Sequence, residues 1–455
     1  MPFLSVRAAQ SPELPALLFE GGQWTYAELN RQVNGLCAAL AGRGLISGDR
    51  LGAALENSPF FVALIHAALR LGLTLVPLNR RLTDAERDWQ LRAAGCKIVI
   101  AQPFNFPFTA SRQPATASRQ PATIIFTSGT TGQPKGALLT LENHQAAARA
   151  SSQRLETRPG ERWLLCLPLY HVGGMSILFR ACFDGLTVIL QERFEPQETH
   201  RLLKQHSAGL VSLVPTMLYR LMPHLERAIP TSLRLILLGG AAAAPELLQK
   251  AFALNLPVAT TYGLTEACSQ VSTALPETAR RKPGCAGAPL PGVEVQIVDA
   301  RGKALPAGET GEIVIRGPAL MRGYLSQPPL NGRFFTGDIG ALDADGDLWV
   351  FTRRSDLIIS GGENVYPDEV ERALMTHPAV REACVFGLPD HEWGQTVAAA
   401  VITRAACDPK TLLDFLRGKM AGYKLPRQIY FLDSLPHTAS GKLKRAECAA
   451  IFLSR

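Results

Sequence analysis

The stretch Thr127–Gly136 reads TSGTTGQPKG, and it follows the apolar run Ala122-Thr123-Ile124-Ile125-Phe126. A short run of β-branched and aromatic residues that breaks into Ser, Thr and Gly is typical of a buried strand feeding a tight loop. Its glycines let backbone N–H groups come close to an anion, its hydroxyls donate hydrogen bonds, and Lys135 adds a positive charge. We therefore expect this loop to bind phosphate.

Two other interpretations of the loop are weaker. The Walker motif ends in Gly-Lys-Ser/Thr at the start of a helix, whereas here Pro134 precedes Lys135 and the apolar Gly136-Ala137-Leu138 follows. A flexible Ser/Thr/Gly linker is the second alternative, but linkers rarely lie between two apolar strands. The phosphate-binding interpretation is favoured.

The composition predicts a globular chain of two or more domains. It has 455 residues, 47% of them hydrophobic, which is more than one ordinary core requires. The most apolar stretch, Leu164–Phe183, is broken by Pro168, His171 and Arg180, so no membrane insertion is expected, and the N-terminus does not resemble a secretory signal. Nine cysteines without a CxxC pair favour free thiols in the cytoplasm over disulfides or a zinc site.

The net charge of +8 favours small polyanions as ligands. The basic residues are dispersed, and the longest cluster, Lys442–Arg445, is short. Because neither a basic arm nor an aromatic-interleaved patch is visible, we expect no nucleic-acid partner.

Strand and helix patterns alternate along the first hundred residues. Thr25 and Glu28 have capping-box spacing at the start of an amphipathic helix over 24–40. Beyond it, strand patterns at 50–55, 73–77 and 97–101 alternate with helical patterns at 59–70 and 83–94. Such alternation predicts an α/β fold with parallel sheets and helices on both faces.

Later in the chain, small and polar residues follow predicted strands. His171 comes after a strand at 163–168 and before two glycines, a place where α/β sheets bind ligands, although a packed histidine is the alternative. The turn Gly239–Ala244 leaves room for a flat ring. Thr265 and Glu266 set a carboxylate beside a hydroxyl, which suits a magnesium–nucleotide complex, and an exposed glutamate is the alternative.

From Gly287 onward, short strands separated by Gly and Pro predict a small β-rich subdomain. The acidic stretch 343–347 resembles a calcium loop, but its glycine comes too early and Arg354 stands where a bidentate glutamate is needed, so we expect a hairpin turn. A separate small domain is predicted from helical patterns at 367–375 and 409–420 and strands at 380–386, 397–402 and 428–432.

Together these motifs resemble the adenylate-forming superfamily, which contains acyl-CoA ligases, carrier-protein-loading adenylation domains and firefly-type luciferases. TSGTTGQPKG is similar to its phosphate-binding loop, and six separated motifs occur in the family order over nearly the whole chain. The resemblance implies a large N-terminal domain over 1–354, with parallel α/β sheets and a small β-rich subdomain, and a small mobile α+β C-terminal domain over 355–455.

The resemblance also implies roles for individual residues. Those that would bind ATP are Thr127, Ser128, Gly129, Thr130, Thr131, Gly132, Gly239, Gly240, Ala241, Tyr262, Gly263, Asp338 and Arg353. The catalytic residues would be Lys135, Thr265 on the α-phosphate, Glu266 on Mg²⁺, and Lys442. The acyl substrate would contact His171, Gly173, Arg180 and Ser269; the domains would rotate at Ser355; and the CoA channel would include Gly361 and Gly362. Many family members have Asp or Lys at the hinge, so Ser355 departs from the common pattern.

The activity implied uses ATP, Mg²⁺ and coenzyme A to convert a small-molecule carboxylic acid, through an acyl-adenylate, into a thioester. The stretches Thr261–Gln270 and Arg353–Pro367 and the compact length are most similar to the o-succinylbenzoate-CoA ligases of menaquinone biosynthesis. A ligase for another aryl or medium-chain acid, and a stand-alone domain that loads a carrier protein, are the alternatives. A homo-oligomer is compatible with this interpretation.

Arg180 bears on the choice of acid, because o-succinylbenzoate keeps a second, aromatic carboxylate that needs a cation in the pocket. In a helix after Gly173-Gly174, helical spacing puts Arg180 on the face of those glycines. The alternative is an exposed i, i+4 ion pair with Asp184.

Overall fold

The structure is a computed structural model, which describes residues 3–106, 120–127, 134–299, 301–352, 357–436 and 445–453. Its contacts define two units, the first within residues 1–79, 91–126 and 136–351, and the second within 80–90, 127–135 and 352–455. None of the described helices has both the length and the apolar character needed to cross a membrane.

A nine-stranded sheet forms the larger part of the first unit, and its central strands are parallel. Its strands, in spatial order, are β14 (Ala288–Pro289), β13 (Ser269–Ala274), β12 (Val258–Leu264), β11 (Leu235–Leu238), β10 (Leu210–Leu213), β8 (Arg162–Leu165), β9 (Thr187–Leu190), β1 (Pro15–Phe19) and β2 (Gly22–Thr25).

Helices cover both faces of this sheet. Trp163 and Leu165 of β8 belong to one core cluster and Leu164 to another, because successive side chains of a strand point to opposite faces. The first cluster includes residues of α1 (Phe3–Gln10), α5 (Leu141–Leu155) and α6 (Val172–Asp184), and the second includes α7 (Pro196–Gln205), α8 (Pro215–Arg227) and α9 (Pro245–Ala253). The predicted parallel sheet with helices on both faces is confirmed.

Two further sheets complete the first unit. A six-stranded sheet has the order β17 (Gly323–Tyr324), β7 (Lys135–Leu139), β6 (Thr123–Thr127), β4 (Thr74–Pro77), β3 (Arg50–Ala53), β5 (Ile98–Ile100), and the helices α2 (Tyr26–Gly42) and α3 (Pro59–Leu71) belong to the same unit. Of α4 (Asp84–Ala94), only the last residues belong to this unit, and Leu91 and Ala94 pack in the apolar cluster of β4 and β6. The predicted β-rich subdomain is a four-stranded sheet of β15 (Glu294–Val298), β16 (Gly311–Arg316), β18 (Phe334–Leu342) and β19 (Leu348–Thr352). The short elements η1 (Thr265–Ala267) and α10 (Pro276–Arg281) flank β13.

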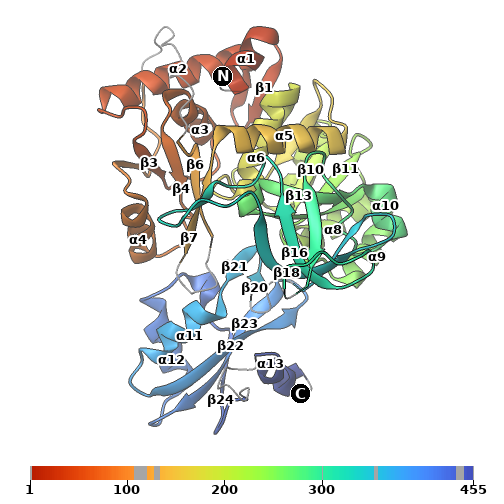
Figure 1. Ribbon diagram of the computed structural model, residues 1–455. Helices are drawn as coiled ribbons and strands as arrows, with labels where there is room; N and C mark the ends of the chain where they lie inside the picture. The colour runs from red at the N-terminus through yellow and green to blue at the C-terminus, as the bar shows by residue number, and fades with distance from the viewer. Residues whose placement is uncertain are drawn as a thin grey trace. The chain divides into compact units, whose positions relative to one another are not determined.

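The C-terminal elements of the second unit, blue in Figure 1, form an α+β layer structure. Its sheet contains β21 (Glu363–Val365), β20 (Ile358–Ser360), β23 (Gly394–Thr403) and β22 (Val380–Asp390), with β24 (Gln428–Phe431) paired to β23. The helical elements are α11 (Pro367–Met375), α12 (Pro409–Arg417), η2 (Gly422–Lys424) and α13 (Arg445–Leu453). Separate apolar clusters lie on the two faces of β22 and β23. Buried Lys424 bonds Glu86 at 2.5 Å and Glu369 at 2.7 Å, which groups residues 80–90 with this unit.

Local patterns place most elements within a few residues. The capping box of Thr25 and Glu28 starts α2 as expected, and α3, α11 and α12 each begin with a proline in the first turn. The helices α1 and α13 are not predicted by the periodicity. Strand β22 runs to Asp390, beyond the expected end at 386, because its whole length pairs with β23.

Candidate active site

The nucleotide motifs follow the parallel strands β11 and β12, where the carboxyl ends of the strands meet. Gly239 and Gly240 come directly after β11, and a Cβ on Gly239 would lie 2.6 Å from Cγ2 of Thr261 on β12. Gly263 faces β13, where a Cβ would lie 1.9 Å from the carbonyl oxygen of Ser269. Backbone packing therefore requires glycine at 263, and the side chain of Thr261 crowds position 239, whereas Ala241 in the same turn as Gly239 is half-buried.

Tyr262 and Asp338, both predicted to bind ATP, lie in direct contact. The phenolic oxygen of Tyr262 donates a hydrogen bond to Oδ2 of Asp338 at 2.5 Å, and both residues are buried. The backbone N–H of Asp338 donates to Oγ1 of Thr336 at 3.0 Å, which fixes the carboxylate-bearing turn. The contact brings an aromatic face and a hydrogen-bond acceptor together from two different sheets.

Thr265 and Glu266 lie in the short helix η1 after β12. Glu266 is 6% exposed, and its Oε1 accepts a hydrogen bond of 2.6 Å from the hydroxyl of Tyr324. Oε2 receives no hydrogen bond from the residues that the structure describes. A carboxylate oxygen without a donor among the described residues, next in sequence to a threonine, fits Mg²⁺, which prefers oxygen ligands. The alternative of a solvent-exposed glutamate is wrong.

Arg180 is buried on α6, with 2% of its surface exposed. Its Nη2 donates to Oγ of Ser269 at 3.2 Å, its guanidinium lies 5.5 Å from the ring centre of Trp163, and its buried Nε makes no hydrogen bond with a described residue. Burial lowers the pKa of Arg180 to about 9. The alternative of an exposed pair with Asp184 is wrong, because Asp184 instead accepts hydrogen bonds from Ser152 and Thr157.

The start of the same helix carries two other residues predicted to contact the acyl substrate, His171 and Gly173. His171 is the N-cap residue of α6, and its ring centre lies 4.7 Å from that of Tyr170. Gly173 is half-buried near Leu167, whereas a Cβ on Gly174 would lie 2.3 Å from the carbonyl oxygen of Pro168. Because a side chain at position 174 would clash with this carbonyl, Gly174 lets the first turn of α6 pack directly against the backbone of Pro168.

The sequence does not predict the polar layer beside Arg180, which consists of Thr123, His144, Cys268 and Ser269. Cys268 and Ser269 have φ of 53° and 97°, a left-handed backbone that non-glycine residues rarely adopt. Nδ1 of His144 lies 3.8 Å from the sulfur of Cys268, and its Nε2 lies 2.9 Å from Oγ1 of Thr123. Burial lowers the pKa of His144 to about 3, so the ring is neutral and Arg180 is the cation of this layer.

The remaining predicted residues belong to the second unit or lie outside the residues that the structure describes. Gly361 and Gly362 join β20 to β21 with φ of 59° and 83°, and a Cβ on Gly361 would lie 2.6 Å from the ring of Trp393. Oγ1 of Thr127 donates to the carbonyl of Lys135 at 3.4 Å, across the ends of the phosphate loop. The predicted residues outside the described ranges are Ser128, Gly129, Thr130, Thr131, Gly132, Arg353, Ser355 and Lys442.

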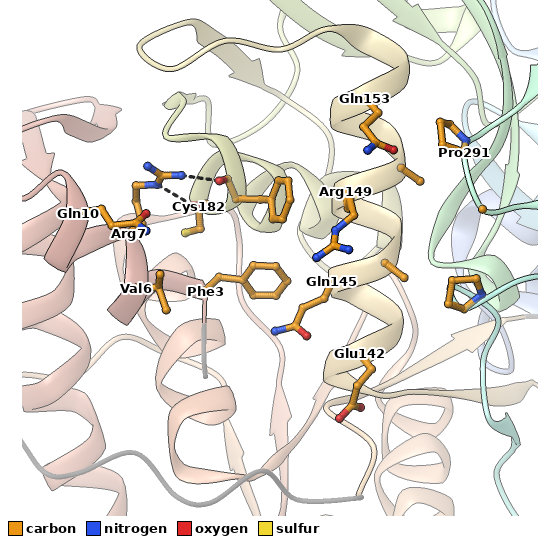
Figure 2. A pocket seen from close by; sticks show the side chains of 15 residues that line it. Phe3, Val6, Arg7, Gln10, Glu142, Gln145, Arg149, Gln153, Cys182 and Pro291 are labelled. Carbon is orange, nitrogen blue, oxygen red and sulfur yellow. Dashed lines mark hydrogen bonds between the residues drawn. The ribbon is translucent and has the colours of Figure 1, made fainter.

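Two other features do not coincide with the predicted site. A groove of about 740 Å³ lies between α1 and α5, and Phe3, Arg7, Gln145 and Arg149 are among its lining residues (Figure 2), but it contains none of the predicted site residues. The acidic stretch at 343–347 is the turn between β18 and β19, as expected. Nζ of Lys282 lies 2.6–2.7 Å from its three aspartates and occupies the place a cation would take.

Comparison with known proteins identifies the class. The model of the AMP-binding enzyme family matches residues 4–112 and 103–325, and that of the AMP-binding enzyme C-terminal domain matches residues 369–442. The chain therefore belongs to the AMP-binding enzyme family.

Several similar proteins carry the name of one ligase, whereas another is an amide bond synthetase. The chain is 39% identical to 2-succinylbenzoate--CoA ligase of Bacillus pumilus, over 96% of this chain and 95% of that protein, and 38% identical to that of Bacillus licheniformis, over 97% and 98%. A structure of o-succinylbenzoate CoA synthetase from Bacillus subtilis with the product analogue OSB-NCoA has a TM-score of 0.93 and 36% identity, over 98% of this chain and 97% of that one. The amide bond synthetase McbA of Marinactinospora thermotolerans has a TM-score of 0.89 and 30% identity, over 99% and 100%.

Proposed function

We propose that this protein is an AMP-forming acid–CoA ligase that converts 2-succinylbenzoate to 2-succinylbenzoyl-CoA in menaquinone biosynthesis. Family membership and near-full-length similarity to ligases of that name support the reaction. The structural observation that carries the choice of acid is the buried Arg180, whose hydrogen-bonding partner is the neutral Ser269. Burial of a charged guanidinium is costly, and one hydrogen bond to a neutral hydroxyl offsets little of that cost. An anionic ligand would pair with the charge, and the aromatic carboxylate of 2-succinylbenzoate is such an anion.

In the first step, an oxygen of the succinyl carboxylate attacks the α-phosphorus of ATP, and the bond to pyrophosphate breaks. Tyr262 offers its ring to adenine, Asp338 accepts from the ribose hydroxyls, Arg353 also binds the ribose, and Thr265 and Lys135 donate to the phosphates. Glu266 would hold Mg²⁺, which supplies charge neutralisation to the phosphates when bound. Lys442 donates to the same phosphates.

In the second step, the sulfur of CoA attacks the acyl carbon and AMP leaves. Between the steps, the small domain, 355–455, rotates about Ser355 relative to the large domain, 1–354. The Gly361-Gly362 turn then forms part of the CoA channel. Because these two left-handed glycines have no side chains, their backbone can line a narrow channel without blocking it.

The substrates are thus small molecules, and we propose a cytoplasmic location without a nucleic-acid partner. The structure describes all nine cysteines and shows no disulfide between them, which suits a reducing compartment.

A panel of acids tests the function. The purified chain is given MgATP, CoA and one of 2-succinylbenzoate, 3-benzoylpropionate, benzoate or octanoate, and both pyrophosphate release and thioester mass are measured. We expect the thioester of 2-succinylbenzoate at the highest kcat/KM. Preference for another acid would overturn the substrate, and adenylation without transfer to CoA would favour a carrier-protein-loading domain.

A further inference from the structure

Tyr324 and Glu266 are 58 residues apart in the chain and share a hydrogen bond of 2.6 Å, from the phenolic hydroxyl to Oε1. The backbone of Glu266 is held by the same segment, because the N–H of Met321 donates to its carbonyl oxygen at 2.7 Å. Both the main chain and the carboxylate of Glu266 are therefore oriented by residues 321–324.

That segment is itself fixed to the strand that leaves the phosphate loop. Tyr324 pairs with Ala137 and Gly323 with Leu138, so β17 lies antiparallel to β7. The N–H of Leu325 donates to the carbonyl of Gly136 at 2.7 Å. Tyr324 thus links the exit of the phosphate loop to Glu266 through one short strand.

The hydroxyl of Tyr324 leaves Glu266 suited to bind a cation. An ionised carboxylate is only an acceptor, so a donor on Oε1 orients the group while Oε2 stays available to a metal. Partners that hydrogen-bond metal-ligating carboxylates tune metal affinity, and their loss commonly costs about 10- to 100-fold. The ring of Tyr324 has a separate packing role, edge-on to Phe334 at 6.4 Å between ring centres.

We propose that Tyr324 is a positioning residue, which holds the carboxylate of Glu266 for Mg²⁺ and fixes its position relative to strand β7. The inference rests on the proposed function, since it assumes that Glu266 receives the magnesium of MgATP. It assigns the effect to the hydroxyl and not to the ring.

Tyr324→Phe tests this, because the variant keeps the ring and removes the donor. Mg²⁺ is titrated into the protein with a non-hydrolysable ATP analogue, and the metal concentration at half of the thermal stabilisation is recorded. The Mg²⁺ dependence of pyrophosphate release is measured in parallel. We expect both midpoints to rise by about tenfold, while thioester formation from supplied acyl-adenylate changes less than twofold.

Tyr26→Phe is the matched control, because its buried hydroxyl donates to the carbonyls of Ala181 and Leu186, away from Glu266. It should lower Tm without moving the metal midpoint. Midpoints in Tyr324→Phe within twofold of the wild type, or a shift of equal size in Tyr26→Phe, would refute the positioning role. If instead the wild type releases no pyrophosphate with any acid of the panel, the proposed function fails, and the thermal titration still decides whether Tyr324 affects metal binding.

Discussion

The hydroxyl of Tyr262 donates to Oδ2 of Asp338 at 2.5 Å, and this hydrogen bond joins the nine-stranded sheet to the β-rich subdomain. Tyr262 lies on β12 and Asp338 on β18, and both side chains are buried. A ribose that binds to Asp338 therefore meets a carboxylate whose orientation is already set by the tyrosine.

Tyr262→Phe should weaken ATP binding without stopping catalysis. The ring remains for adenine, but Asp338 loses a donor, and hydrogen bonds to charged groups contribute about 1.5–3 kcal/mol. Because part of that energy is regained when the ribose binds, we expect KM for ATP to rise about 3- to 10-fold, with kcat and KM for the acid within twofold. Steady-state kinetics of pyrophosphate release measure this, and an unchanged KM for ATP would count against the assigned role of Asp338.

The Lys282 cluster should make stability depend on acid pH. Burial raises the pKa of Asp343, but hydrogen bonds from Lys282 and Trp349 outweigh this effect and hold the pKa at about 2. A carboxyl whose pKa is lower in the folded state stabilises the fold above its unfolded pKa of about 4, and this contribution is lost as the pH falls from about 4 towards 2.

Asp343→Asn should therefore cost about 1 kcal/mol at pH 7, a figure discounted for solvent screening. The difference between variant and wild type should shrink as urea unfolding is repeated from pH 5 down to pH 2.5. A difference that stays constant over this range would show that Asp343 acts by packing and not by its charge.

Lys442 lies outside the described residues, and its role follows from the resemblance. Lys442→Ala should slow adenylate formation by at least about 100-fold, the usual loss when one donor to developing charge is removed. Thioester formation from supplied acyl-adenylate should stay within threefold, because only the first conformation would bring Lys442 to the phosphates. Equal losses in both half-reactions would contradict a two-conformation cycle.

The sequence predicts local elements well and long-range contacts poorly. The capping box of α2 and the proline starts of α3 and α11 arise within a few residues, so the pattern contains the information. The left-handed backbone of Cys268 ends the short helix η1 between the paired strands β12 and β13, and a cysteine gives no local signal of this conformation.

The residues of the candidate site also fall into two groups, those that the sequence predicts and those that it does not. Gly239, Tyr262 and Glu266 are predicted from their motifs, since Gly239 and Glu266 come just after recognisable strands and Tyr262 lies near the end of one. Tyr324 is missed because its partner is 58 residues away and its own segment resembles an ordinary turn. His144 is missed because a histidine on a helix gives no sign of the buried layer that it joins.

The central claim is that Arg180 binds the aromatic carboxylate of 2-succinylbenzoate. A comparison of two acids, with and without that carboxylate, tests it most directly. Arg180→Gln is compared with the wild type using 2-succinylbenzoate and 3-benzoylpropionate, which lacks the aromatic carboxylate. Arg70→Gln is the matched control, because Arg70 is also buried but bonds Asn30, Asn34 and Ser5, so its loss should lower Tm without changing acid preference.

Loss of a desolvated ion-pair partner costs about 2–5 kcal/mol, against less than about 1 kcal/mol for a surface pair. We therefore expect Arg180→Gln to lower kcat/KM for 2-succinylbenzoate by about 30-fold or more, with KM for ATP nearly unchanged and little effect on 3-benzoylpropionate. A loss below tenfold, or an equal loss with both acids, would contradict the account.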